Sequence, residues 1–231
     1  MQVKLLLIGG FGFNDLALSG VSELFAEYRF IDINQFSENY TLEMMAAHLI
    51  QVQSEYQADY IVAYSMGGLV LLKAIELSSI RLANKLILLN STPCFMAKED
   101  WQGVSLQNYE TLIIRLSRSS FDSFMTYLSR FFAYPYSVNN EINYREWWAD
   151  TNHKRLFNLL SIFFITDLGE KCAKYIEKII WINSSDDVLV KINEPWQNSI
   201  ILANSSHLLF DKYELNAFLS SHILSLECDN G

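Results

Sequence analysis

The chain has 231 residues, 51% of them apolar, and a formal net charge of −9. This length and apolar content predict one large domain with a buried core. The negative charge argues against nucleic-acid binding, which depends on neutralising phosphates. No apolar run reaches the roughly 18 residues of a membrane helix, and the glycines after the run that starts at Leu5 interrupt it too early for a secretory signal.

The three cysteines, Cys94, Cys172 and Cys228, form an odd and widely spaced set without the spacing of metal ligands. They predict reduced thiols in a cytoplasmic protein and no metal site. Cys94 is a weak rival nucleophile, because no histidine or acid accompanies it in a recognisable turn.

Strands and helices alternate along most of the chain. Strands are expected at 3–8, 29–33, 59–64, 84–90, 178–183 and 199–203. Helices are expected at 20–28, 41–56, 66–78, 169–176 and 211–225. Such alternation predicts an α/β fold, with a mainly parallel central sheet and helices on both of its faces.

Residues 98–168 break this alternation. They contain no clear strand, and apolar residues recur three or four apart within 109–116, 121–131 and 156–163. We expect a helical cap at 98–168, inserted into a core formed by 1–97 and 169–231. Most aromatic residues of the segment fit the packing of helices, and the remainder suit an apolar channel for an acyl chain.

Ser65 lies between the strand pattern at 59–64 and the helix pattern at 66–78. Ala63 and Gly67, two places to either side, are small residues. This is the context of a nucleophile elbow, in which a serine on a strained turn needs small neighbours so that strand and helix can pack closely. Ala63 stands in place of the usual first glycine. The alternative is an ordinary β–turn–α connection with an incidental serine.

The elbow pattern requires an acid and then a histidine later in the chain. Of the four histidines, His48 precedes Ser65, His153 lies in the inserted segment, and His222 falls within the last helix pattern. His207 follows the last predicted strand and a short loop, where a catalytic base is expected.

The polar turn after the strand at 178–183 contains two acids, Asp186 and Asp187. An acid there could accept the Nδ1–H of His207 and stabilise the imidazolium that forms. The register of the strand favours Asp187, and Asp186 remains the alternative. A solvated pair of turn residues is the non-catalytic explanation.

The glycine-rich loop Gly9-Gly-Phe11-Gly12 follows the first strand. Its spacing fits neither a dinucleotide fingerprint nor a phosphate-binding loop with its lysine, so no cofactor is expected. The N–H groups of Phe11 and of Met66, the residue after the serine, are the expected oxyanion donors.

These segments resemble a family of α/β-hydrolases, the pimeloyl-acyl-carrier-protein methyl ester esterases of bacterial biotin synthesis. Gly9-Gly-Phe-Gly-Phe-Asn14 is similar to the family's His-Gly-Trp-Gly-Leu-Asn loop, and Ala63-Tyr-Ser-Met-Gly-Gly-Leu69 to its Gly-Trp-Ser-Leu-Gly-Gly-Leu turn. Asn90-Ser-Thr-Pro-Cys-Phe-Met-Ala-Lys-Glu-Asp-Trp-Gln-Gly103 is similar to its Ser-Ser-Pro-Cys-Phe-Ser-Ala-Arg-Asp-Glu-Trp-Pro-Gly run. Leu159–Leu168 is similar to the segment that leads from the family's cap back to its core.

The resemblance implies a carboxylesterase that releases methanol from pimeloyl-acyl carrier protein, with Ser65 as nucleophile, Asp187 as acid, His207 as base and Phe11 as an oxyanion donor. Gly9 departs from the family's histidine. The match also starts at the family's third strand, so the N-terminal antiparallel hairpin is expected to be missing or reduced. A small-ester carboxylesterase or acyl thioesterase, or a non-catalytic binding protein of the same fold, remains an alternative.

The expected cap contains an excess of basic residues although the protein is acidic. Residues 112–130 include Arg115, Arg118 and Arg130 but Asp122 as their one acid. On a shared outer face they would form a basic surface for an acidic acyl carrier protein, a partner that the family resemblance favours. A solvated helix face is the alternative.

Overall fold

The computed structural model describes residues 3–78, 82–136, 144–191, 199–208 and 215–221. Its centre is a six-stranded sheet in the order β2-β1-β3-β4-β5-β6, and each strand pairs with its neighbours in parallel. The strands are β1 (Lys4–Ile8), β2 (Glu27–Ile31), β3 (Tyr60–Tyr64), β4 (Lys85–Leu89), β5 (Ile179–Ser184) and β6 (Ile200–Leu202).

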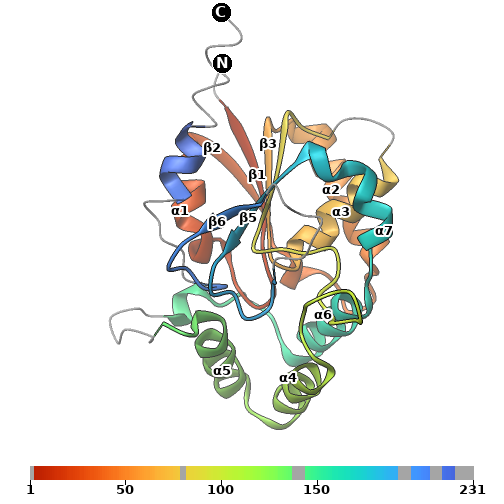
Figure 1. The fold of residues 1–231 in the computed structure, drawn as a ribbon, viewed down its shortest axis with the longest axis vertical. Coiled ribbons are helices and arrows are strands. Elements are labelled where there is room, and N and C mark those ends of the chain that lie inside the picture. The colour runs from red at the N-terminus through yellow and green to blue at the C-terminus, as the bar shows by residue number, and fades with distance from the viewer. Residues whose placement is uncertain (1–2, 79–81, 137–143, 192–198, 209–214, 222–231) are drawn as a thin grey trace, which may run out of the picture.

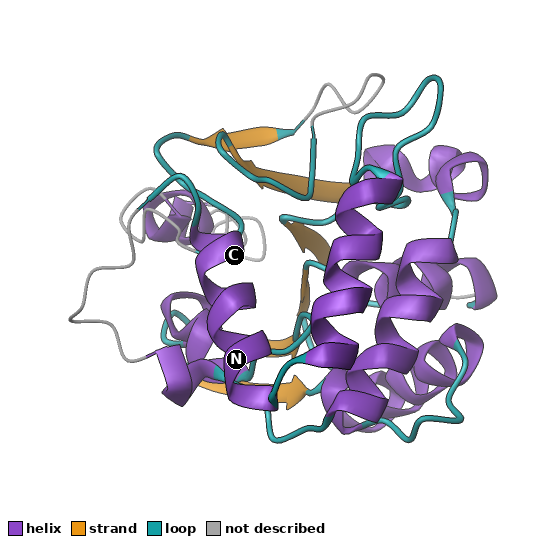
Figure 2. Ribbon diagram, turned by 90° about the horizontal axis from the view of Figure 1, so that it is seen from below, coloured by secondary structure: helices purple, strands orange, loops and turns teal. Residues whose placement is uncertain are grey.

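Helices cover both faces of this sheet (Figures 1 and 2). One face carries α2 (Leu42–Tyr56), α3 (Gly67–Leu77) and α7 (Gly169–Cys172), and the other carries α1 (Ser19–Ser22) and the helical residues 215–221. Short 3₁₀ helices span Asp15–Leu18, Ile33–Gln35, Tyr144–Trp147 and Ala173–Lys178. The α/β-type fold expected from the sequence is confirmed.

The sheet is buried on both faces because alternate side chains of each strand enter different cores. In β1, Leu6 and Ile8 join the apolar cluster beneath α2 and α3. Leu5 and Leu7 join the cluster on the opposite face, with Leu215 from the C-terminal helical residues. The strands therefore form a rigid platform whose carboxyl ends hold the loops that follow them.

Three long helices lie between β4 and β5 in the chain. They are α4 (Leu106–Arg118), α5 (Phe121–Ala133) and α6 (His153–Ile165). Ser105, Ser120 and Asn152 cap their first turns by accepting backbone N–H groups, which explains where each helix begins. Figure 1 shows them together at the end of the sheet opposite the N-terminus, beyond the carboxyl ends of the strands.

The six predicted strands are present within two residues of their expected bounds, whereas the prediction for the first helix is partly wrong. A helix was expected at 20–28, but α1 ends at Ser22 and β2 begins at Glu27. Tyr28, Phe30 and Ile31 favour a strand, and pairing with β1 extends that strand to Glu27.

The later helices also differ from expectation at their ends. The helix expected at 169–176 consists of α7 followed by a 3₁₀ turn from Ala173. Of the helix expected at 211–225, residues 215–221 are helical and the others lie outside the described residues, as do His222 and Cys228.

Candidate active site

Ser65 occupies a sharp turn between β3 and α3. Its φ angle of +52° is the left-handed conformation that side-chain-bearing residues rarely adopt. Two donors hold its carbonyl oxygen, the N–H of Gly68 at 2.9 Å and the hydroxyl of Ser91 at 2.7 Å. A Cβ atom on Gly67 would lie 2.3 Å from the carbonyl oxygen of Gly9, so this turn requires glycine there.

The structure brings Ser65, His207 and Asp187 into one hydrogen-bonded chain. Ser65 Oγ lies 2.7 Å from His207 Nε2, and His207 Nδ1 lies 2.7 Å from Asp187 Oδ2. Since Asp187 accepts at Nδ1, the neutral ring presents an unprotonated Nε2 to the hydroxyl, as a general base must.

The backbone after Asp187 fixes its carboxylate. Oδ1 accepts the N–H groups of Leu189 at 2.7 Å and Val190 at 2.9 Å, which leaves Oδ2 directed at His207. Asp186 is placed differently. Its side chain is half-buried and accepts a hydrogen bond from the Tyr136 hydroxyl at 2.6 Å, a contact that lowers the pKa of the Asp186 carboxyl. The structure therefore places Asp187, not Asp186, against the histidine.

The glycine-rich loop lies directly beside the serine. A Cβ atom on Gly10 would lie 3.1 Å from Ser65 Cβ, so the backbone there approaches the nucleophile closely. This position follows from the strand order, because β1 and β3 are neighbours whose chains continue to opposite sides of the sheet. Ligand sites of open α/β sheets form in the crevice at such a switch point.

The N–H groups of Phe11 and Met66 border this crevice. Phe11 follows Gly10, and Met66 immediately precedes the first residue of α3. Among the described residues, neither N–H donates a hydrogen bond to another protein group. The two groups are thus available to a bound oxygen, although their role as oxyanion donors stays a prediction.

Sequence reasoning missed Asn34, which holds the glycine-rich loop in place. The side chain is fully buried, and its Oδ1 accepts the N–H of Gly12 at 2.7 Å. Its Nδ2 donates to the carbonyl oxygens of Gly10 at 3.0 Å and Phe13 at 3.3 Å. A lone asparagine after a strand is too common a pattern to identify such a contact from the sequence.

Helix α5 packs against His207, the middle one of the three aligned residues. The ring of Phe132 packs edge-on against His207 with centroids 4.7 Å apart, and the Phe132 carbonyl oxygen accepts the N–H of Leu208 at 3.1 Å. Ser65 is 1% exposed and His207 is 0% exposed. The site is therefore closed to solvent, and electrostatic interactions inside it are weakly screened.

The three arginines expected to form a basic surface lie exposed on α4 and α5. The guanidinium of Arg115 stacks 4.1 Å above the ring of Tyr127. Among the described residues, no carboxylate forms an ion pair with Arg115, Arg118 or Arg130.

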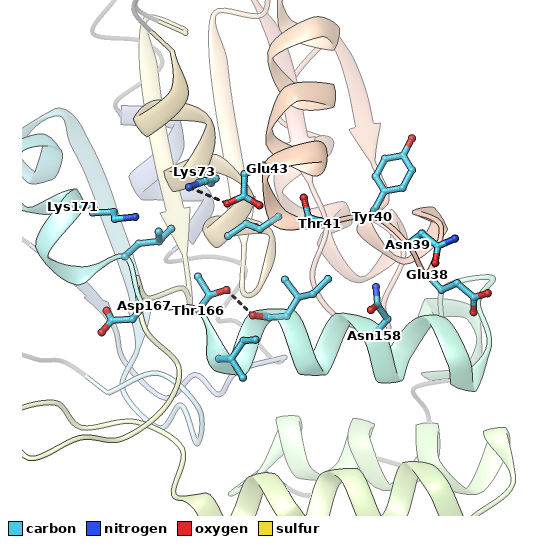
Figure 3. Close-up of a pocket in the computed structure, with 14 residues that line it drawn as sticks. Glu38, Asn39, Tyr40, Thr41, Glu43, Lys73, Asn158, Thr166, Asp167 and Lys171 are labelled. Carbon is cyan, nitrogen blue, oxygen red and sulfur yellow. Dashed lines mark hydrogen bonds and ion pairs between the residues drawn. The ribbon is translucent and has the colours of Figure 1, made fainter.

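A separate polar cavity of about 450 Å³ lies between the start of α2, α3 and the end of α6, as Figure 3 shows. Lys73 and Glu43 both line it and form an ion pair at 3.1 Å, and Lys73 forms a second ion pair with Glu76 at 3.0 Å. None of the three aligned residues lines this cavity. Across the described ranges, no group of three or more metal-ligating side chains is present, and no helix is long and apolar enough to cross a membrane.

Comparisons with known proteins give one partial sequence relative and many similar structures. No protein-family model matches the chain. Over 111 residues the chain is 30% identical to the pimeloyl-[acyl-carrier protein] methyl ester esterase of Aeromonas salmonicida, a match that covers 44% of this chain and 42% of that protein. The chain thus spans less than half the length of this curated relative.

The similar structures match nearly the whole chain. A bromoperoxidase from Bacillus anthracis superposes with a TM-score of 0.78 at 17% identity, over 98% of this chain and 92% of its own. An esterase from Exiguobacterium antarcticum superposes with a TM-score of 0.75 at 16% identity, over 96% of this chain and 93% of the esterase. A hydrolase from Oleispira antarctica gives 0.72 at 18% identity, over 97% and 92%. With its parallel sheet and its serine turn after β3, the chain therefore has the α/β-hydrolase fold.

Proposed function

We propose that this protein is a serine hydrolase of carboxylic esters, with Ser65 as nucleophile, His207 as general base and Asp187 as the orienting acid. The observation that carries the proposal is the continuous contact of these three side chains, 2.7 Å at each step, on a strained turn. A serine hydroxyl at its ordinary pKa is a weak nucleophile, and an aligned base is what activates it.

The reaction follows from this geometry. Nε2 of His207 takes the proton of the Ser65 hydroxyl as Oγ attacks the ester carbonyl carbon. The N–H groups of Phe11 and Met66 stabilise the negative oxygen of the tetrahedral intermediate. The imidazolium then protonates the leaving alkoxide, and the acyl group remains on Oγ. Water attacks the acyl-enzyme by the same steps and releases the carboxylic acid.

We propose the methyl ester of pimeloyl-acyl carrier protein as the substrate, so that the products are methanol and pimeloyl-acyl carrier protein. The motif resemblance over 9–14, 63–69 and 90–103 supports this choice, as does the similarity to the Aeromonas salmonicida esterase. We also propose a cytoplasmic location, which the odd and widely spaced set of three cysteines in the sequence supports.

We further propose that residues 98–168 act as a cap over a core formed by 1–97 and 169–231. Support comes from α5, whose apolar face closes the site. A Cβ atom on Gly12 would lie 3.0 Å from Cδ2 of Leu128 and 3.2 Å from Cε of Met125. An acyl chain reaching Ser65 would have to displace these side chains, so we propose that they line the acyl site when the cap opens.

The outer surface of the same cap is where we propose that the carrier protein docks. Arg115, Arg118 and Arg130 are exposed there without an ion-pair partner among the described residues, on a molecule whose net charge is −9. Complementary charge would steer an acidic carrier toward the cap and raise the association rate.

The first experiment compares wild-type protein with Ser65→Ala on pimeloyl-acyl carrier protein methyl ester, followed by mass spectrometry, with a p-nitrophenyl acyl ester as control. We expect demethylation of the carrier-bound ester and a loss of kcat on the order of 10⁶ in the variant. Full activity in a clean Ser65→Ala preparation would refute the nucleophile. Cleavage of the small ester alone would refute the carrier-bound ester as the substrate. The protein would then be a general carboxylesterase or acyl thioesterase.

Charge reversal tests the docking surface separately. Replacing Arg115, Arg118 and Arg130 by glutamate should raise KM for the carrier-bound ester and leave the small ester unaffected, because the surface lies outside the reacting groups. The rise should shrink at high salt, where surface charges are screened. Unchanged kinetics on both substrates would show that the arginines are solvated surface.

A further inference from the structure

The backbone of His207 is held by two buried side chains that have no part in the proton transfers described above. The Tyr64 hydroxyl donates to the His207 carbonyl oxygen at 2.7 Å. Nδ2 of Asn90 donates to the same oxygen at 3.1 Å and to the carbonyl oxygen of Ser206 at 3.1 Å. Both lone pairs of the His207 carbonyl oxygen are therefore engaged.

The two donors come from the ends of the two central strands. Tyr64 is the last residue of β3 and directly precedes Ser65. Asn90 directly follows β4 and has a φ angle of +45°, a conformation that asparagine tolerates better than most residues. Its Oδ1 accepts the N–H of Ser184 at 2.7 Å, which also fastens it to β5.

The Tyr64 ring adds a second contact to the same histidine. The ring packs against the imidazole with centroids 5.3 Å apart, and Tyr64 is only 1% exposed. Burial raises the pKa of the Tyr64 hydroxyl well above its usual value, so the hydroxyl stays a donor across the pH range of ordinary assays. One residue therefore contacts both the side chain and the main chain of His207.

His207 depends on such contacts because it lies in a loop and not in a strand. The chain passes through Asn204, whose φ angle is +49°, between β6 and His207. Both ring nitrogens must nevertheless keep 2.7 Å contacts on opposite sides of the ring. A displacement of about 1 Å between reacting groups can cost a rate factor on the order of 10².

We propose that Tyr64 and Asn90 are positioning residues that set the place of the His207 imidazole by holding its backbone to the ends of β3 and β4. The inference rests on the proposed function, since it concerns the base that activates Ser65. His207 would then be held by the same strand end that carries Ser65. Small movements of the His207 loop would therefore not separate the base from the nucleophile.

The test is the rate at which a fluorophosphonate probe labels Ser65, measured with kcat and KM on a p-nitrophenyl ester. Tyr64→Phe keeps the ring against His207 and removes one hydroxyl. The matched control is Tyr60→Phe, the same deletion on the same buried face of β3, at the far end of the strand. Wild-type protein and Ser65→Ala are labelled in parallel, and each variant's Tm is recorded.

We expect Tyr64→Phe to lower the labelling rate and kcat together by about tenfold, the effect of one well-placed hydrogen bond. KM should not change, and Tyr60→Phe should stay near wild type in both rates. Asn90→Asp removes the donors to two carbonyl oxygens but keeps an acceptor for Ser184. It should lower both rates further.

Several results would overturn the inference. They are wild-type rates in Tyr64→Phe, equal losses in Tyr64→Phe and Tyr60→Phe, or a rise in KM with kcat intact. Wild-type labelling in a folded Asn90→Asp protein would remove the role of Asn90. If wild-type protein is not labelled at Ser65, the proposed function falls and the inference falls with it. Labelled wild type with unaffected Tyr64→Phe overturns the positioning role alone.

Discussion

Replacing Asn34 by alanine should uncouple the glycine-rich loop from the core. In the structure, Asn34 makes short hydrogen bonds to the N–H of Gly12 at 2.7 Å and to the carbonyl oxygen of Gly10 at 3.0 Å. Asn34→Ala leaves both backbone groups buried without these partners. At about 1–3 kcal/mol for each unsatisfied group, the free energy of unfolding should fall by about 2–6 kcal/mol. The total free energy of unfolding of a folded protein is about 5–15 kcal/mol, so the expected loss is large.

Catalysis should suffer beyond this loss of stability. Phe11, the proposed oxyanion donor, lies between the two residues that Asn34 holds. If the loop moves, its N–H no longer points at the place where negative charge develops. Removing one such donor costs on the order of 10²–10³ in kcat. KM should change little, because the donor acts on the transition state more than on the bound ester.

The assay combines denaturant unfolding with ester hydrolysis well below the Tm of the variant, so that the folded fraction is known. Asn84→Ala is the control, because Asn84 is an exposed asparagine whose side chain makes a longer hydrogen bond, 3.3 Å, to Asp59. A wild-type unfolding free energy in Asn34→Ala would refute the loop-anchoring argument. A lowered unfolding free energy with unchanged kcat would refute the link between this loop and the oxyanion.

Two further predictions concern the acids of the molecule. Asp187→Ala should lower kcat on the order of 10⁴, whereas Asp186→Ala should stay near wild type, and equal or reversed losses measured on a small ester would contradict the assignment. Lys73 should contribute to stability at neutral pH. The pKa of the Glu43 carboxyl is lowered, first by a hydrogen bond from the backbone N–H of Glu43 itself and then by one from Lys73. Burial raises the pKa of the Glu76 carboxyl, but hydrogen bonds from Lys73 and Lys171 outweigh burial, and the pKa is lowered overall. Because the folded-state pKa values are lowered, this stabilisation is present above pH 4.5 and is lost as pH falls through them. Lys73→Met should therefore show a smaller fall in Tm between neutral and acidic pH than wild type. The difference should be a few degrees at most, because the Glu43 side chain is exposed and solvent screens its ion pair, and an equal fall would contradict the argument.

The sheet could be predicted from the sequence because each buried strand is an apolar run bounded by turn residues. The same reasoning located the three aligned side chains, since Ser65, Asp187 and His207 each follow a strand and the carboxyl ends of parallel strands meet at one edge. Their contacts are observed in the structure, while their catalytic roles stay predictions. The helix at 20–28 was overextended because the strand at Glu27 depends on pairing with β1, which local sequence does not report.

Asn34, Tyr64 and Asn90 were out of reach for a different reason. Each acts through a hydrogen bond to a backbone group distant in sequence, 143 residues away for the Tyr64 hydroxyl. An asparagine or tyrosine at the end of a strand has many possible partners, and only the folded chain selects one. The packing of α5 over His207 is equally non-local, because its amphipathic pattern shows which face is buried but not what that face covers.

Hydrogen bonds to the backbone and the packing of α5 have different roles in the site. The polar groups that hold the backbone of Ser65 and His207 come from the strand ends and the loops that follow them. The proposed acyl site is bounded instead by α5, whose Met125 and Leu128 lie against Gly12. The side chains of Met125 and Leu128 take no part in the hydrogen bonds that hold Ser65 and His207. Substrate choice in this protein should therefore depend on α5, and reaction type on the strand ends.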